Sequence, residues 1–134
     1  LEQDLFVTKD KGDPFNRPMM ISFDQTHPLY ILIKKLNLLR QNNLALRYGH
    51  TRLLYYDKDI LAFERVFKDN IVLFITSKKS SSDEDGFVFK DVSLKDGIYA
   101  NLMNDLEQYS INNNTLKINI KGGNTYILYT TFKN

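Results

Sequence analysis

Two side chains of opposite charge stand close together in a turn-forming segment near the start of the chain. Asp13 and Arg17 are four residues apart, and Pro14 and Pro18 restrict the backbone beside each of them. A carboxylate accepts hydrogen bonds from hydroxyl groups and a guanidinium donates a fork of them, so the pair suits a neutral polyol such as a sugar. The same spacing suits a local Asp13–Arg17 ion pair that only holds the turn. Spacing alone leaves the two interpretations equal.

The other side chains that could take part in chemistry favour structural or solvent-exposed roles. His27 and His50 are far apart in the sequence, and neither has a partner at the spacing of metal ligands. The acidic run at 83–85 could gather a weakly bound calcium ion, although a solvated loop is the stronger interpretation. Five tyrosines could stack on sugar rings, but aromatic residues that alternate along strands more often pack in or beside a core. They are Tyr55, Tyr56, Tyr99, Tyr126 and Tyr129.

The composition of the 134 residues is that of one globular domain. Hydrophobic residues make up 43% and aromatic residues 13%, which argues against disorder. Lys and Arg number 18 against 16 Asp and Glu, and the net charge of +2 is too small to predict binding to nucleic acid or to a membrane surface. The sequence has no cysteine, and its apolar runs are shorter than the ~20 residues of a membrane span. It opens without an initiator methionine, so we expect a fragment or a processed product.

Residues 27–42 have the pattern of an amphipathic helix. Pro28 suits the first helical turn, and Thr26 is a candidate N-cap. Ile31 and Leu38 lie outside the main apolar stripe, so more than one side of the helix is apolar. We therefore expect the helix to pack on a second body besides its own domain. The stripe itself consists of Leu29, Leu32, Ile33, Leu36 and Leu39.

From Leu46 onward the hydrophobic period changes to two, which is typical of β-strands. The segment Asp57-Lys58-Asp59 separates two such runs and predicts a hairpin. Short strands with regular turns favour a mainly β fold, an antiparallel sandwich with Greek-key connections. The predicted strands are 52–56, 60–67, 71–75, 86–90, 97–102, 115–120 and 125–132.

The order and spacing of several motifs resemble the alpha-amylase family of glycoside hydrolases, above all its cyclodextrin glucanotransferases and maltogenic amylases. The resemblance is strong over residues 2–77 and becomes a general pattern beyond them. Each motif alone is weak, but together they are specific. The motifs are Glu2-Gln3, Gly12-Asp13-Pro14-Phe15-Asn16-Arg17 with Met19-Met20, the helix end at 36–43, Ala45-Leu46-Arg47-Tyr48-Gly49, and the runs at 60–67 and 70–73.

The resemblance implies a (β/α)8 barrel followed by an antiparallel β-sandwich, of which this chain would hold only the end. Residues 1–43 would be the last loop and helix of a truncated catalytic barrel, and residues 44–134 the C-terminal sandwich domain. The second apolar side of the predicted helix would then face the barrel.

The resemblance also gives the opening turn a role. In barrel enzymes the loops after the strands line the active site, and in the similar enzymes the Asp and Arg of this motif bind a donor-side glucose. Asp13 and Arg17 are therefore implied to bind substrate, and Asn16 matches the same motif and is expected to shape its turn. The chain departs from the family pattern at Phe15, where a polar residue is usual, and at Leu44, where a proline is common.

No catalytic residue is expected within the chain. A retaining glycosidase needs a nucleophilic carboxylate and an acid/base carboxylate about 5–5.5 Å apart, and in this family both come from earlier barrel strands. The chain alone is therefore expected to be inactive, whereas the parent would act on α-1,4-glucans such as starch, by hydrolysis or by transglycosylation.

The implied partners are an α-glucan oligosaccharide and the missing barrel, with no nucleic acid and no membrane. The resemblance implies no cofactor and no metal in this chain, leaves calcium open for the parent, and slightly favours a secreted bacterial parent over a cytoplasmic one. The alternative is a stand-alone, non-catalytic β-sandwich module that binds carbohydrate or a protein partner.

Overall fold

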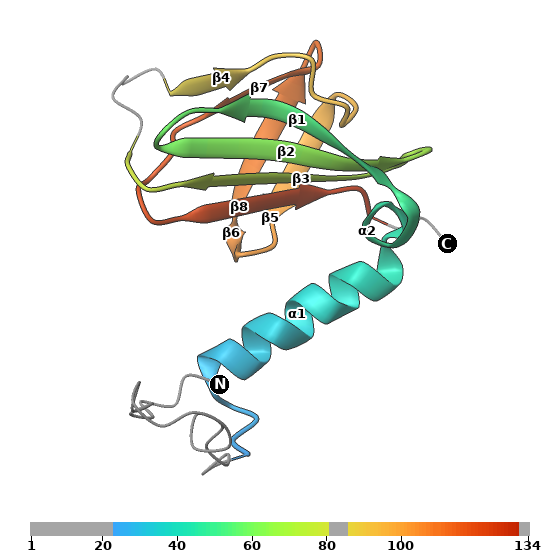
Figure 1. The fold of residues 1–134 in the computed structure, drawn as a ribbon, viewed down its shortest axis with the longest axis vertical. Coiled ribbons are helices and arrows are strands. Elements are labelled where there is room, and N and C mark those ends of the chain that lie inside the picture. The colour runs from blue at the N-terminus through green and yellow to red at the C-terminus, as the bar shows by residue number, and fades with distance from the viewer. Residues whose placement is uncertain (1–22, 81–85, 132–134) are drawn as a thin grey trace, which may run out of the picture. The chain divides into compact units, whose positions relative to one another are not determined.

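The described part of the chain consists of two helices and eight strands in the computed structural model (Figure 1). The chain divides into two compact units, Leu1–Asn37 and Leu38–Asn134. The structure describes residues 23–80 and 86–131, so 1–22, 81–85 and 132–134 lie outside it.

Helix α1 (Pro28–Asn42) confirms the predicted helix. Its first turn is capped by His27, whose ring nitrogen Nδ1 accepts a hydrogen bond from the Leu29 N–H at 3.2 Å. Thr26 does not cap the helix, because its N–H and its hydroxyl both donate to the carboxylate of Asp24, at 2.8 and 2.7 Å. The predicted N-cap is therefore one residue too early.

The apolar side chains of α1 are mostly exposed. Leu39 is the buried residue of the helix and belongs to the second unit. Exposed apolar residues occur both on the predicted stripe and outside it, in agreement with a helix that is apolar on more than one side. They are Ile31, Ile33, Leu36 and Leu38.

A second helix that the sequence pattern does not predict, α2 (Leu44–Tyr48), follows directly. Asn43 is its N-cap, since the Asn43 side-chain oxygen accepts from the Ala45 N–H at 3.0 Å. The amide nitrogen of Asn43 donates to the backbone oxygen of Thr130, so the helix start is tied to the end of the last strand. Gly49 is the C-cap of α2, and the position requires glycine because a Cβ there would stand 2.4 Å from the Ala45 carbonyl oxygen.

The first sheet, sheet A, contains strands that are far apart in the sequence. It is antiparallel, and its order is β1-β2-β3-β8. The predicted hairpin at Asp57 joins β1 to β2: the Asp57 carboxylate accepts from the N–H groups of Asp59 and Ile60 at 2.7 and 2.6 Å. The strands are β1 (His50–Tyr56), β2 (Ile60–Phe67), β3 (Asn70–Ser77) and β8 (Thr125–Tyr129).

The second sheet, sheet B, is also antiparallel and has the order β4-β7-β6-β5. Three consecutive strands pair with each other while β4 lies beside the last of them, which is the predicted Greek-key connection. The turn between β6 and β7 places Asn113 and Asn114 at φ of 49° and 54°, as a tight hairpin turn requires. The strands are β4 (Phe87–Phe89), β5 (Gly97–Asn101), β6 (Asn104–Asn112) and β7 (Thr115–Ile118).

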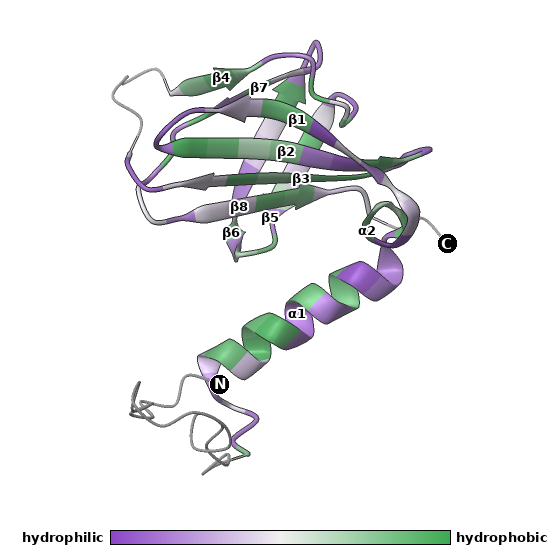
Figure 2. Ribbon diagram, viewed as in Figure 1, coloured by the Kyte–Doolittle hydropathy of each residue, from purple (hydrophilic) through white to green (hydrophobic). Residues whose placement is uncertain are grey.

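The main core lies between the two sheets, and in Figure 1 sheet A is seen in front of sheet B. Hydrophobic residues follow the strands in both sheets (Figure 2). A second, smaller cluster lies on the outer side of sheet A, where Leu39 and Ala45 pack against Val72 and Ile127. The core between the sheets includes Ala62, Leu73, Ile75, Leu94, Ile111, Leu116, Ile118, Ile120, Tyr126 and Leu128.

One acidic side chain lies inside the sandwich. Glu64, in the middle of β2, is fully buried. Its carboxylate accepts from Arg52 Nε at 3.0 Å and from the Ser93 N–H at 2.8 Å, and Arg52 also donates to the backbone oxygen of Asp91. Because Arg52 is on β1 and Ser93 is on the connection from β4 to β5, this carboxylate joins the two sheets. A buried ionised group of this kind is stable only when its oxygens are paired.

Replacing Arg52 tests this arrangement. Arg52→Ala should lower the free energy of unfolding by about 3 kcal/mol, the lower end for breaking a buried ion pair, since Arg52 is itself partly exposed. Glu64→Gln should cost less, because its amide oxygen can still accept from the Ser93 N–H. Urea unfolding of the 134-residue chain measures both free energies of unfolding.

The matched control is Arg65→Ala, which removes a hydrogen bond to Thr51 between exposed groups and should cost less than about 1 kcal/mol. Equal losses for the two arginines would contradict this role for Glu64.

Candidate functional site

The predicted substrate-binding residues lie outside the described part of the structure. Asp13, Asn16 and Arg17 all fall within residues 1–22, so the structure says nothing of whether they come together. The acidic run at 83–85 is also outside the described residues. The sugar-binding and ion-pair interpretations of the opening turn therefore both stand as predictions.

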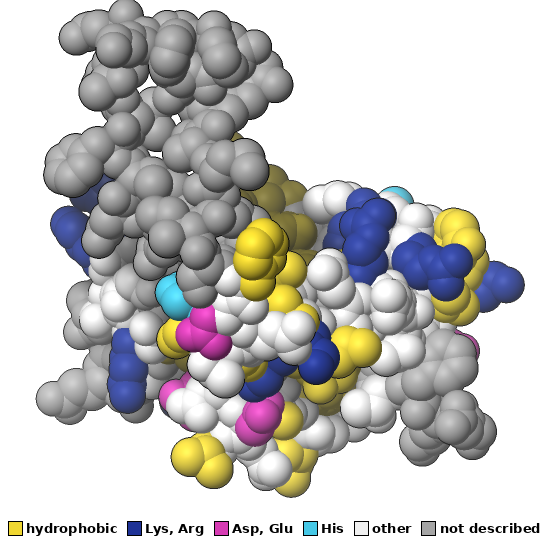
Figure 3. Space-filling model, turned by 90° about the horizontal axis from the view of Figure 1, so that it is seen from below, with side chains coloured by type: hydrophobic (Ala, Val, Ile, Leu, Met, Phe, Trp, Pro, Cys, Tyr) yellow, Lys and Arg dark blue, Asp and Glu magenta, His cyan; other side chains and the backbone are white. Residues whose placement is uncertain are grey.

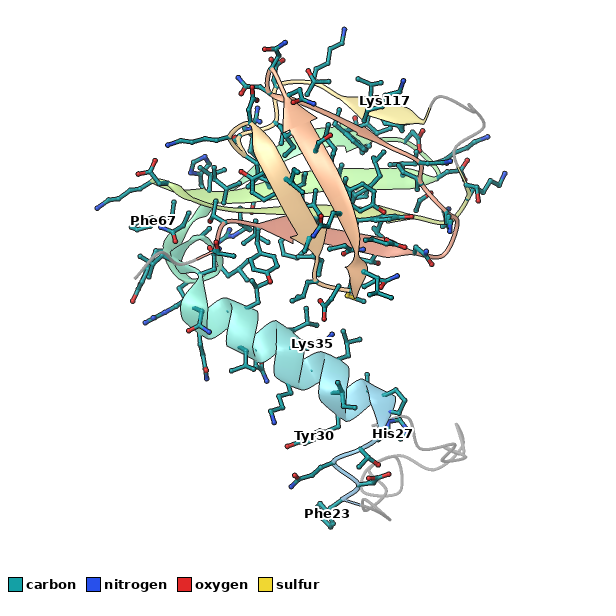
Figure 4. All side chains as sticks on the ribbon, turned by 180° about the vertical axis from the view of Figure 1, so that it is seen from behind. Phe23, His27, Tyr30, Lys35, Phe67 and Lys117 are labelled. Atoms are coloured by element: carbon teal, nitrogen blue, oxygen red, sulfur yellow. The ribbon has the colours of Figure 1, made fainter. Side chains whose placement is uncertain are left out.

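The described segment that leads from this turn into α1 is held by local hydrogen bonds. Asp24 accepts two hydrogen bonds from Thr26, which hold the pKa of the Asp24 carboxyl below its ordinary value. Its neighbour His27 then caps α1 (Figure 4). The segment 23–27 thus forms a fixed turn at the start of the helix, and its polar groups have local structural roles.

Neither histidine belongs to a metal site in the described structure. Within residues 23–80 and 86–131, no three His, Cys, Asp or Glu side chains are grouped so that they could hold a metal ion. His27 caps a helix and His50 begins β1. The structural interpretation of both histidines is consistent with these positions.

Four of the five tyrosines named as candidate sugar-stacking residues take part in packing. Tyr126 is buried, and its hydroxyl accepts from the Lys121 N–H at 2.9 Å. Tyr55 meets the ring of Phe87 edge-on, with 4.7 Å between the ring centroids. Tyr99 packs against the main core and Tyr129 against the outer cluster. Tyr56 alone among the five is largely exposed, at 71%.

A cluster of polar side chains surrounds Glu107 on β6. Its carboxylate accepts from the Tyr109 hydroxyl at 2.9 Å and from the side-chain amides of Asn101 and Asn104 at 3.3 and 3.2 Å. The bond from Tyr109 is the main cause that lowers the pKa of the Glu107 carboxyl. Burial, followed by the bond to Glu107, raises the pKa of Tyr109. Asn101 is buried and its oxygen accepts from the Ile127 N–H at 3.0 Å, so the cluster connects β6 to sheet A.

This cluster therefore has a structural function. Its hydrogen bonds join residues of β5, β6 and β8, and no buried side-chain nitrogen or oxygen in the described residues lacks a partner. The sequence pattern does not predict the cluster, because it does not predict strand β6. The Lys and Arg side chains lie in several separate places on the face shown in Figure 3, with no single basic stripe on that face. None of the described helices is both long and apolar enough to cross a membrane.

Comparison with known proteins shows the relationship directly. A cyclomaltodextrin glucanotransferase from Bacillus sp. (strain 1-1) is 36% identical over 111 residues, which cover 83% of this chain. An alpha-amylase from Niallia circulans is 30% identical over 118 residues, or 87% of this chain. The chain belongs to the alpha-amylase family of glycoside hydrolases. No protein-family model matches the sequence.

Solved structures agree with these sequence relatives. The gamma-CGTase of alkalophilic Bacillus clarkii has a TM-score of 0.76 and 28% identity, and the match covers 92% of this chain. A cyclomaltodextrin glucanotransferase with a three-domain ABC distribution has the same TM-score with 30% identity over 90% of this chain. The mainly β fold and the resemblance to this family are therefore confirmed.

The chain spans only a small share of each relative. It covers 15% of the enzyme from Bacillus sp. (strain 1-1), 21% of the alpha-amylase from Niallia circulans and 26% of the three-domain enzyme.

We expect the Glu107 cluster to make the stability of the fold depend on pH. A carboxyl whose pKa is lower in the folded than in the unfolded chain stabilises the fold above its unfolded pKa, near 4.5. That stabilisation is lost as the pH falls through the folded pKa. The melting temperature should therefore decrease below about pH 4.5, and Glu107→Gln should remove part of this decrease. Asp69→Asn, at a largely exposed ion pair with Lys95, is the control and should leave the pH profile unchanged. If the two variants have the same profile, Glu107 has no such role.

Proposed function

We propose that this chain is the C-terminal part of an alpha-amylase-type glycoside hydrolase or glucanotransferase that acts on α-1,4-glucans. The observation that carries the proposal is the 36% identity with a cyclomaltodextrin glucanotransferase over 83% of the chain. In this proposal residues 1–43 are the last loop and helix of the catalytic barrel, and residues 44–134 are the sandwich domain.

The chain contributes substrate binding and leaves the covalent chemistry to the rest of the parent enzyme. Asp13 and Arg17 hold one glucose unit of an oligosaccharide: the carboxylate accepts hydrogen bonds from sugar hydroxyls and the guanidinium donates them. Asn16 shapes the turn between them. The nucleophile and the acid/base carboxylate that a retaining mechanism requires lie in the part of the parent that precedes this chain, so the chain alone is inactive.

The bonding pattern of the sandwich supports a structural role for residues 44–134 within this proposal. The carboxylate of Glu64 is fully buried and bonded to Arg52 and Ser93, and that of Glu107 bonds to Tyr109, Asn101 and Asn104, so both carboxylates help to hold the sandwich together. Tyr55, Tyr99, Tyr126 and Tyr129 pack within the fold, and Tyr56 is the one of the five candidate sugar-stacking tyrosines that is largely exposed.

The test is made in the intact parent enzyme. Asp13→Ala and Arg17→Ala should each reduce kcat/KM on long maltooligosaccharides by a factor of about 10–100, the effect of losing a charged hydrogen bond to substrate. Maltotriose, which does not reach every subsite, should be affected less. Steady-state kinetics on maltotriose and on long dextrins measures the difference.

Asn43→Ala is the matched control, since Asn43 caps α2 and its side chain bonds to Ala45 and Thr130. It should lower the melting temperature without changing the ratio of the two kcat/KM values. Equal losses on maltotriose and long dextrins for Asp13→Ala and Arg17→Ala would favour the ion-pair interpretation and contradict the substrate contact.

A further inference from the structure

The start of α1 depends on a side chain that can change its charge near neutral pH. The ring nitrogen Nδ1 of His27 accepts a hydrogen bond from the Leu29 N–H at 3.2 Å, and the His27 carbonyl oxygen accepts from the Ile31 N–H at 3.1 Å. Pro28 disfavours a helical backbone at the residue before it and has no N–H of its own, so the helix begins there. His27 therefore serves as the N-cap of α1, and its ring pairs with a backbone donor that has no partner within the helix.

Histidine differs from the residues that usually cap a helix. Ser, Thr, Asn and Asp are preferred at this position, and their side-chain oxygens accept hydrogen bonds at every pH near 7. A histidine ring changes its charge between about pH 5 and 8. The neutral ring can accept at Nδ1 when its proton is on Nε2, whereas both nitrogens of the protonated ring carry hydrogen and neither can accept. Protonation of His27 therefore removes the bond to Leu29.

Two electrostatic effects act on the protonated ring in the same direction. The positive end of the α1 dipole lies at the first turn, where a cation is unfavourable. Asp24 attracts the ring, since the pKa of its carboxyl is lowered first by the two Thr26 bonds and also by the charge of His27. Both Thr26 bonds go to Oδ1 of Asp24, so Oδ2 takes no part in them. The two effects favour a protonated ring that leaves the helix and approaches Asp24.

The side chains of α1 itself do little to change this balance. Tyr30 is the first titratable one, and a tyrosine is neutral below pH 8. The first charged ones are Lys34 and Lys35, about 10 Å along the axis at 1.5 Å per residue, which is a full Debye length at ~0.1 M salt. Figure 4 shows His27 at the start of the helix and Lys35 further along it. Among the described residues of α1 and of the segment before it, Asp24 is therefore the charged group that acts most directly on the protonated ring.

The start of α1 is also where the chain arrives from the predicted substrate-binding turn. Arg17 stands six positions before Phe23, the first described residue, and ten before His27. A helix without its cap frays at that end, and the direction in which the preceding chain leaves the helix is then no longer fixed. Loss of the cap therefore reaches the turn through a short stretch of backbone.

We propose that His27 is a positioning residue for the substrate-binding turn of Asp13 and Arg17, and that it holds this turn only while its ring is neutral. The inference rests on the proposed function, and it adds a dependence on pH to the same binding residues. At pH 8 the capped helix fixes the direction of the chain before it. At pH 5.5 the ring lies against Asp24, the first turn of α1 frays, and long maltooligosaccharides are bound less tightly.

The cap itself is tested by NMR in the 134-residue chain. The amide signal of Leu29 should shift with pH along the same curve as the ring signals of His27. In His27→Asn the side-chain oxygen can cap the helix but does not titrate, so the Leu29 signal should stay constant between pH 8 and 5.5. His50→Asn is the matched control, since it removes the other histidine, exposed at the start of β1, and should leave the Leu29 curve unchanged. A Leu29 signal that does not follow His27 would overturn the proposal.

The effect on substrate is measured in the intact parent enzyme, as the ratio of kcat/KM on long maltooligosaccharides to kcat/KM on maltotriose. Titration of the catalytic carboxylates affects both substrates and cancels in this ratio. From pH 8 to 5.5 the ratio should fall about fivefold, mainly through KM, which is the equilibrium change that corresponds to the loss of one cap. His27→Ala should have the low ratio at both pH values and His27→Asn the high ratio at both, whereas His50→Asn should behave as the wild type.

The outcomes separate this inference from the proposed function. Equal losses on maltotriose and on long substrates for Asp13→Ala and Arg17→Ala would contradict the proposed function itself. If those two variants behave as expected but His27→Asn has the same pH-dependent ratio as the wild type, the positioning role of His27 alone is overturned. A wild-type ratio that is constant from pH 8 to 5.5 overturns that role as well.

Discussion

Glu64 lies in the middle of β2 with its carboxylate facing the space between the sheets, where an ionised group needs a donor for each oxygen. Arg52 supplies one donor from the neighbouring strand, and the Ser93 N–H supplies another from the connection between β4 and β5. This requirement constrains other parts of the fold besides the ion pair itself. It places β1 beside β2 in a single register, and it brings the β4–β5 connection against sheet A. The surrounding apolar core gives most of the stability. We infer that the carboxylate favours one way of closing the sandwich.

The elements with strong local patterns could be predicted from the sequence. Helix α1 has a clear apolar stripe and a proline at its start, and the β1–β2 hairpin has an Asp at the turn that accepts from two backbone N–H groups. In β3 an unbroken apolar run corresponds to a strand with neighbours on both sides. In each case the residues that determine the element lie within it.

The elements that were missed depend on contacts distant in sequence. Strand β6 carries Glu107 and Tyr109 on its inner side and Leu106, exposed by 94%, near its start, so its apolar pattern is weak. It is a strand because β5 and β7 pair with it on both sides. Helix α2 has only five residues, and it is held by the Asn43 cap and by packing on the outer side of sheet A. The sequence does not predict the role of Glu64 either. A charged residue in a strand with this pattern is usually expected to face solvent.

The family resemblance is what predicts that Asp13 and Arg17 bind substrate. Their spacing alone suits an ion pair and a sugar-binding pair equally well. The family relationship and the mainly β fold are established by the relatives and by the sheets themselves.

The central claim is that these residues form one wall of an active site whose carboxylates belong to an earlier part of the same chain. The coding sequence upstream of Leu1 tests it most directly. An open reading frame that encodes barrel strands with the nucleophilic carboxylate and the acid/base carboxylate is the predicted result. A stop codon or an unrelated domain immediately before Leu1 would contradict it.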